Sequence, residues 1–227
     1  RIAHEHGVLL LVDGAQTIGS MPVTMASTGA DLLAFPGHKG LLGPTGTGGL
    51  VIGERVSTEM LATTREGGTG GNSEEDVQPA DLPGRYEAGT LNTVGIAALG
   101  AALEVLIETG VEAVEAHERD VTTRLIDGLN SISGIDVLSP ESATRRAAVV
   151  SFTVDGWEPA DFGAALDSNF EIACRTGLHC APDACAALGA FPRGTIRMSP
   201  GFYTTNEEVD RALEAVGELA RAALRLA

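Results

Sequence analysis

The sequence predicts an α/β fold: part of a large domain with a mostly parallel sheet, followed by a smaller α+β domain. A continuous apolar run at residues 8–12 ends in a polar turn, which is typical of a buried parallel strand. Two helical segments, residues 93–109 and 111–130, then link it to a region of mixed strands and helices. We therefore place the partial large domain at residues 1–110 and the small domain at residues 111–227.

The first domain begins with the end of a helix. Residues 1–7 lack a Met and end in Gly7, a pattern typical of the last turns of a helix. Because a protein rarely begins in mid-unit, we expect that an N-terminal part is missing from this sequence. Residues 30–35 and 48–52 are predicted to form the next two strands, and residues 67–73 a glycine-rich loop.

The second domain alternates strands and helices. Its last helix is predicted by a capping box from Thr205 to Glu208 and by an apolar stripe from Val209 to Leu224. The other predicted elements are strands at 135–138, 148–154, 171–175 and 195–198, and helices at 159–169 and 181–188.

Composition excludes several classes of function. Hydrophobic residues make up 44% of the chain, enough for a core, and the formal net charge is −16. Such an acidic chain is not expected to bind nucleic acid or an anionic membrane. We find no apolar stretch of membrane-spanning length and no secretory signal. Three cysteines do not make a disulfide framework, so a cytoplasmic location is expected.

A lysine in a glycine-rich turn is the first candidate for chemistry. Lys39 follows the strand at residues 30–35, where the turn leaves little room for a bulky neighbour. Desolvation there would favour the free amine over the ammonium, and a free amine can form a Schiff base. A solvated loop lysine is the alternative interpretation.

Asp13 is the second candidate, because it follows the carboxyl end of a predicted strand, where ligands sit in open α/β sheets. A turn aspartate that caps the next segment is the alternative. Asp13 and Lys39 together suggest pyridoxal phosphate, which needs a lysine for covalent attachment and an acidic group at its ring nitrogen. His38 is a candidate donor to the phosphate, or else a structural loop histidine.

Several motifs then make the hypothesis specific. They are Val12-Asp13-Gly14-Ala15-Gln16, Gly37-His38-Lys39, Arg85-Tyr86-Glu87-Ala88-Gly89-Thr90, Arg175-Thr176-Gly177-Leu178-His179-Cys180 and Thr195-Ile196-Arg197. By the first two motifs the chain resembles the class V aminotransferase superfamily of fold-type I pyridoxal phosphate enzymes, and by the other three its cysteine desulfurase and selenocysteine lyase branch. The match covers nearly the whole chain and implies that about the first half of a full-length enzyme is absent here.

The resemblance implies a role for each cofactor-binding residue. Lys39 would hold the cofactor, and Asp13 would pair with its ring nitrogen. Gln16 would lie near the phenolic oxygen of the ring, and His38 near the phosphate. Thr90 would reach the phosphate of the neighbouring subunit's cofactor, so a homodimer is expected.

The resemblance also implies the reaction. Cys180 would take sulfur from L-cysteine and become a persulfide, leaving alanine, and a separate acceptor protein would receive the sulfur. Arg197 would bind the substrate carboxylate, for which a guanidinium is well suited. Arg175 and His179 would supply positive or polarisable groups nearby.

Four alternatives stay open. The substrate could be L-selenocysteine, or the enzyme a transaminase or β-eliminating lyase in which Cys180 is structural. The protein could be a non-catalytic partner subunit, although the joint presence of Asp13, Lys39, Cys180 and Arg197 argues against this. The cysteines and His179 could also bind a metal, but their spacing does not fit Cys-x-x-Cys pairs, and Cys174 and Cys185 are expected in the core.

Overall fold

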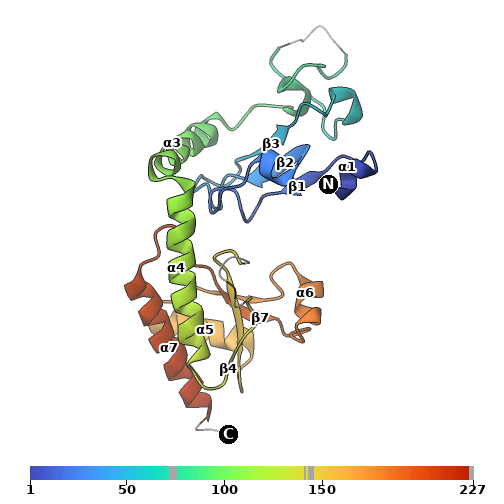
Figure 1. Ribbon diagram of the computed structural model, residues 1–227. Coiled ribbons are helices and arrows are strands. Elements are labelled where there is room, and N and C mark those ends of the chain that lie inside the picture. The colour runs from blue at the N-terminus through green and yellow to red at the C-terminus, as the bar shows by residue number, and fades with distance from the viewer. Residues whose placement is uncertain (72–75, 141, 143–145, 225–227) are drawn as a thin grey trace. The chain divides into compact units, whose positions relative to one another are not determined.

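A computed structural model describes residues 1–71, 76–140, 142 and 146–224 (Figure 1). The chain divides into two compact units, Arg1–Glu112 and Ala113–Ala227, which we call the N-terminal and C-terminal units. The placement of domain boundaries at residues 110 and 111 stays a prediction. Asn72 and Ser73 of the predicted glycine-rich loop lie outside the described residues.

The N-terminal unit contains a three-stranded sheet in the order β1-β2-β3. β1 pairs with β2 in parallel, and β2 pairs with β3 in the antiparallel sense. Over the described strands the sheet is thus mixed, where a mostly parallel one was predicted, because the turn after β2 folds the chain straight back. The elements are α1 (Ile2–Glu5), β1 (Leu11–Asp13), α2 (Met25–Thr28), β2 (Leu32–Pro36), β3 (Gly48–Ile52), η1 (Thr58–Met60), η2 (Gly84–Tyr86) and α3 (Thr93–Thr109).

The first strand differs from its prediction in length and in burial. Val8 and Leu11 are 55% and 54% exposed, so this run is not the buried strand that its composition suggested. β1 is an edge strand of the described sheet, with a neighbour on one side only. β2 is the central strand, and Leu32 and Leu33 on it are buried.

The C-terminal unit contains a four-stranded antiparallel sheet in the order β4-β5-β7-β6. Its elements confirm most predicted bounds to within two residues. β6 is the exception: Glu171 ends the preceding helix in a left-handed conformation, so pairing starts only at Arg175. The elements are α4 (Val111–Asn130), β4 (Ile135–Val137), β5 (Val150–Val154), α5 (Pro159–Phe170), β6 (Arg175–Gly177), α6 (Pro182–Ala187), β7 (Thr195–Met198) and α7 (Asn206–Leu224).

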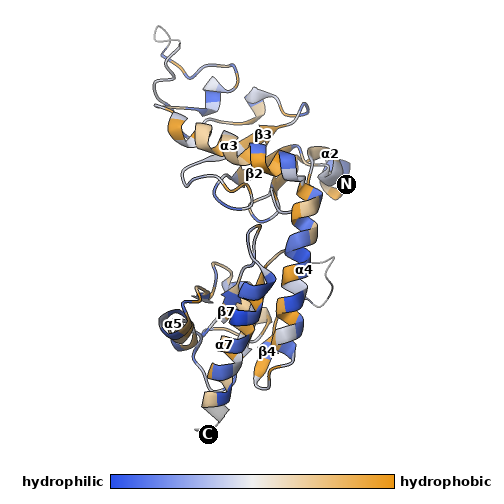
Figure 2. Ribbon diagram, turned by 90° about the vertical axis from the view of Figure 1, so that its left-hand side faces the viewer, coloured by the Kyte–Doolittle hydropathy of each residue, from blue (hydrophilic) through white to orange (hydrophobic). Residues whose placement is uncertain are grey.

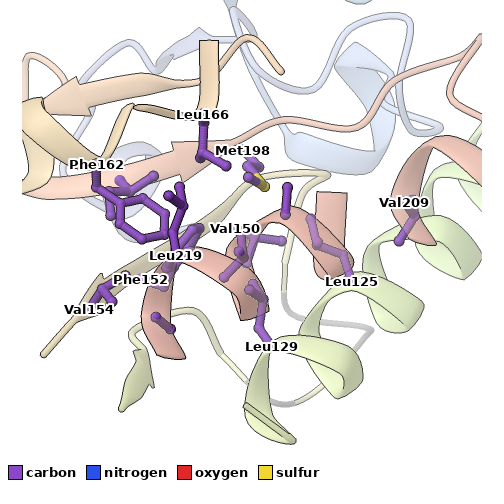
Figure 3. Packing of buried hydrophobic residues seen from close by; sticks show 14 of the residues in the cluster. Leu125, Leu129, Val150, Phe152, Val154, Phe162, Leu166, Met198, Val209 and Leu219 are labelled. Carbon is purple, nitrogen blue, oxygen red and sulfur yellow. The ribbon is translucent and has the colours of Figure 1, made fainter. Parts of the chain in front are cut away.

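The core of the C-terminal unit lies on one face of this sheet (Figure 3). Alternate residues of β5 are buried, as expected for a strand with one face covered. They pack with residues of β7 and with the apolar faces of α4, α5 and α7. Register then assigns Ser151, Arg197 and Arg175, which are paired in a row across the strands, to the opposite face.

The last helix forms as predicted. The hydroxyl of Thr205 accepts a hydrogen bond from the backbone N–H of Glu208, and the Glu208 carboxylate accepts one from the N–H of Thr205, at 3.2 and 2.9 Å. Val209 and Val216 on its stripe are buried. The side chain of Leu224 lies outside the described residues.

Helix α3 is coloured mostly as hydrophobic along its length (Figure 2). Within the described part of the chain, no single helix is long and apolar enough to cross a membrane. α3 and α4 form a bent pair that reaches the required length and apolar content only when the two helices are taken together. This holds by length and composition alone.

Candidate active site

The carboxyl ends of β1 and β2 meet at one edge of the N-terminal sheet. Asp13, the last residue of β1, is in register with Ala34 on β2. β2 ends at Pro36, and Lys39 follows three residues later. Because the two strands are parallel, the structure brings Asp13 and Lys39 to the same edge, which is where ligands bind in α/β sheets.

The turn after β1 packs directly against the loop that carries Lys39. The Asp13 carboxylate accepts a hydrogen bond from the backbone N–H of Ala15 at 2.9 Å, which fixes the start of the turn. Further along, a Cβ at Gly19 would lie 2.3 Å from the carbonyl group of Gly40, so only glycine allows this approach. Gln16 lies exposed on the same turn.

The loop that carries Lys39 is held by backbone bonds and by α3. Gly37 donates to the carbonyl of Thr47 and accepts from the N–H of Gly43, both at 2.8 Å. A Cβ at Gly43 would lie 2.6 Å from the side chain of Leu99, so α3 packs closely on this loop. The backbone around Lys39 is therefore well fixed.

The side chains of His38 and Lys39 are exposed. The desolvated lysine that the sequence suggested is thus not observed, and this prediction is wrong for the chain as described. No described part of the chain covers these two side chains. They are open to a ligand rather than packed.

Thr90 is exposed just before α3, after a left-handed Gly89. Two residues later, Asn92 caps the helix by accepting from the N–H of Gly95 at 3.0 Å, and its amide donates to the carbonyl of Gly46 at 3.4 Å. Asn92 thus ties the Thr90 segment to the Lys39 loop. We did not single out Asn92 from the sequence, although an asparagine directly before a helical run is a known N-cap signal.

In the C-terminal unit, two arginines lie side by side on the face opposite the core. Arg175 and Arg197 are direct cross-strand partners on β6 and β7. Within the described residues neither forms an ion pair, and the buried Nε of Arg197 has no hydrogen-bond partner. Like charges placed opposite each other are unfavourable. This pair is therefore suited to share an anionic ligand.

Cys180 lies beside one of these arginines. A guanidinium Nη2 of Arg175 donates to its sulfur at 3.3 Å, and the thiol is exposed. His179 and Cys180 both have left-handed backbones, with φ of 54° and 61°. Such conformations are strained for residues other than glycine and gather at functional sites.

His179 is fixed by Thr195. Its Nε2 lies 3.1 Å from the carbonyl oxygen of Thr195 and 2.9 Å from the hydroxyl. Burial lowers the pKa of His179, and the charges of Arg197 and Arg175 lower it further, against the opposing effect of the Thr195 bond. Both effects disfavour the charged form of the imidazole.

The other two cysteines lie away from solvent. Cys185 is buried, and Cys174 is half-buried against the core cluster, where burial, followed by the charge of Asp167, raises the pKa of its thiol. Their expected core positions are thus confirmed. Over the described residues we find no group of three or more His, Cys, Asp or Glu side chains that could hold a metal ion.

Comparisons with known protein sequences agree with the resemblance seen in the motifs. A sequence model of the family described as "Aminotransferase class-V" matches residues 1–212. The chain is 38% identical to a probable cysteine desulfurase of Methanothermobacter thermautotrophicus over 97% of its length, and 35% identical to a cysteine desulfurase of Escherichia coli, also over 97%. It spans 55% and 53% of these two proteins.

Solved structures give the same result. The apo cysteine desulfurase of Thermococcus onnurineus NA1 superposes with a TM-score of 0.87 at 34% identity, over 97% of this chain and 55% of that one. A cystine C-S lyase, C-DES, in complex with its product cysteine persulfide superposes with a TM-score of 0.76 at 30% identity, over 93% and 52%. The resemblance seen in the motifs is confirmed: this chain belongs to the class V aminotransferase family.

Proposed function

We propose that this chain is part of a pyridoxal phosphate-dependent cysteine desulfurase, which removes sulfur from L-cysteine to give alanine and a persulfide on Cys180. The observation that carries the proposal is the exposed thiol of Cys180 on a strained turn, 3.3 Å from the guanidinium of Arg175. A guanidinium at this distance donates a hydrogen bond to the sulfur, and the thiolate is the nucleophilic form of cysteine. The similarity to cysteine desulfurases supports the same reaction.

The residues at the edge of the N-terminal sheet fit the cofactor. Lys39 offers an amine for its aldehyde, and Asp13 a carboxylate for its ring nitrogen. Gln16 and His38 supply further polar groups, and Thr90 a hydroxyl for the phosphate held in a neighbouring subunit. The close glycine contact between the two loops leaves these side chains on a fixed backbone. When bound, the cofactor stabilises negative charge at the α-carbon of an amino acid.

The residues of this chain then act on the substrate as follows. Arg197 binds the carboxylate, and Lys39 takes the proton from the α-carbon. The thiolate of Cys180 forms a bond to the substrate sulfur as the carbon–sulfur bond breaks, and the electron pair stays with the β-carbon. Protonation of that carbon, together with the return of a proton from Lys39 to the α-carbon, gives alanine, and Cys180 keeps the sulfur as a persulfide.

The test is Cys180→Ala in the full-length protein. We expect alanine formation from cysteine to fall on the order of 100-fold or more, because the nucleophile is lost. The absorbance of the bound cofactor should be retained, since Lys39 is intact. Cys174→Ala is the matched control and should keep turnover. Unchanged turnover in Cys180→Ala would exclude the proposal.

A β-eliminating lyase is the second candidate function, favoured by the likeness to the cystine C-S lyase. Product analysis separates the possibilities. A desulfurase gives alanine, a β-lyase gives pyruvate with ammonia, and a transaminase gives a keto acid without release of ammonia. Parallel assays with cysteine and selenocysteine decide which of these two substrates is preferred.

We further propose a homodimer, in which Thr90 serves the neighbouring subunit, and a separate protein that accepts the persulfide sulfur. A cytoplasmic location would keep Cys180 reduced, and the described cysteines are free thiols. Size measurement of the full-length protein tests the dimer.

A further inference from the structure

Thr195 is buried and contacts His179, and its sequence motif gave no role to this residue. It lies on β7 two residues before Arg197, so both belong to the face opposite the core. Nevertheless Thr195 is only 2% exposed. Its carbonyl and its hydroxyl both contact the Nε2 of His179, at 3.1 and 2.9 Å.

The carbonyl contact favours one form of the His179 ring. The Thr195 hydroxyl can donate to Nε2 or accept from it, but a carbonyl oxygen only accepts hydrogen bonds, so its contact is satisfied only when Nε2 carries the hydrogen. In the neutral ring the lone pair then resides on Nδ1. This Nδ1 is buried and has no hydrogen-bond partner among the described residues. No acceptor there would stabilise the opposite tautomer, which carries its hydrogen on Nδ1.

The backbone that carries His179 needs such an anchor. His179 and Cys180 are consecutive left-handed residues, an arrangement that persists only where surrounding contacts hold it. Within the turn, the N–H of Ala181 donates to the carbonyl of Leu178 at 2.9 Å. The Thr195 contacts tie the turn to the sheet.

The position of Thr195 itself is fixed by two glycines. Gly177 pairs with Thr195 across β6 and β7. A Cβ at Gly194 would lie 2.2 Å from the backbone of Gly177, so the strand ends are in direct contact. Both glycines have positive φ, at 100° and 80°. The turn therefore leaves the sheet at one defined point, with His179 over Thr195.

We propose that Thr195 is a positioning residue: it holds His179 as the Nε2–H tautomer and, through His179, holds Cys180 beside Arg175. The role of Cys180 as a nucleophile rests on the function proposed above, whereas the contact between Thr195 and His179 does not. Thr195 acts through its neighbour and does not touch the substrate.

The test measures the reactivity of Cys180 in the full-length protein with Thr195→Val. Alkylation by iodoacetamide at pH 7 is followed by mass spectrometry on the peptide that contains Cys180, which separates it from Cys174 and Cys185. Valine keeps the shape and the carbonyl but removes the hydroxyl. We expect alkylation to slow about threefold to tenfold. Loss of one hydrogen bond would lower by this factor the fraction of molecules in which Cys180 lies beside Arg175.

Two matched variants frame this result. Thr195→Ser restores the hydroxyl and should restore the rate, which a role in packing alone would not predict. Thr153→Val removes a hydroxyl from the neighbouring strand β5, at a position paired with Asp136, and should leave the rate unchanged. An unchanged or faster rate in folded Thr195→Val, or no rescue by serine, overturns the proposal.

A second measurement does not depend on any variant. Nuclear magnetic resonance of the ¹⁵N-histidine-labelled wild-type protein at pH 7.5 should show His179 neutral with hydrogen on Nε2. Hydrogen on Nδ1, or a charged ring, overturns the proposal even if Thr195→Val does not fold. Failure of the desulfurase function would appear separately, as turnover that survives Cys180→Ala.

Discussion

At the scale of single residues, Asp31 shows how one buried charge organises the start of the chain. Its carboxylate accepts from the backbone N–H of Leu10 at 2.7 Å and lies 2.8 Å from the Nε2 of His4 and 3.5 Å from Arg55. The bond from Leu10, followed by that from His4, lowers the pKa of Asp31 against the effect of burial. The side chain thus ties α1 and the segment before β1 to β2.

Asp31→Asn should therefore change how stability depends on pH. A carboxylate whose pKa is lowered by folding adds stability above its ordinary pKa and loses it as the pH falls through the ordinary and then the folded value. We expect the variant to be less stable than the wild type at pH 6 and the difference to shrink below about pH 4. Thermal melting of the full-length protein between pH 6 and 3 measures this. Asp136→Asn, at an exposed position on β4, is the control.

Arg197 should influence the titration of His179. Its positive charge opposes protonation of the ring, and burial does so more strongly. Arg197→Gln is therefore expected to raise the pKa of His179 towards, but not above, its ordinary value near 6.5. A histidine titration by nuclear magnetic resonance checks the direction. A lower pKa of His179 in the variant would contradict the conclusion that the charge of Arg197 acts on this ring.

At the scale of elements, the core of the C-terminal unit depends on the seam between α4 and the sheet. Leu129 is fully buried there, at 0% exposure (Figure 3). Leu129→Ala should lower the free energy of unfolding by about 2–5 kcal/mol, since the cavity adds to the lost burial. Leu188→Ala, at 51% exposure, should change it by less than about 0.5 kcal/mol. Urea denaturation compares the two, and equal losses would contradict this description of the core.

The elements that sequence reasoning placed correctly are those whose signals are local. The bounds of α3 and α4 follow from apolar periodicity and from Gly110 between them, and α7 follows from its capping box. β1 and β6 were misplaced because strand bounds depend on the partner strand. For β6 the deciding event is the left-handed Glu171, which delays pairing with β7.

The candidate site was predictable in its residues but not in its contacts. The motifs named Asp13, Lys39 and Cys180, and topology places the first two at one sheet edge. The contact between His179 and Thr195 depends on strand register and on the approach of two glycines 17 positions apart, which no local pattern encodes. The exposure of Lys39 likewise depends on what lies over its loop.

At the scale of the whole molecule, the proposed roles are divided between the two units. The residues assigned to the cofactor belong to Arg1–Glu112, and those assigned to sulfur transfer belong to Ala113–Ala227. The chain spans about half the length of the curated relatives it matches. Each unit is held by its own sheet, so variants of the C-terminal unit such as Cys180→Ala are expected to lose sulfur transfer while they keep the bound cofactor.

The proposed dimer makes the sharpest prediction, because Thr90 would serve the partner's cofactor. Thr90→Val should weaken cofactor binding about tenfold to 100-fold, the effect of a lost bond to a charged phosphate. Lys39→Ala should abolish turnover. When the two variants are mixed and allowed to exchange subunits, a mixed dimer contains one site with intact Lys39 and intact Thr90. At low cofactor concentration it should recover about half of the wild-type activity per dimer. If Thr90 acted within its own subunit, both sites of the mixed dimer would be defective, and mixing would restore nothing.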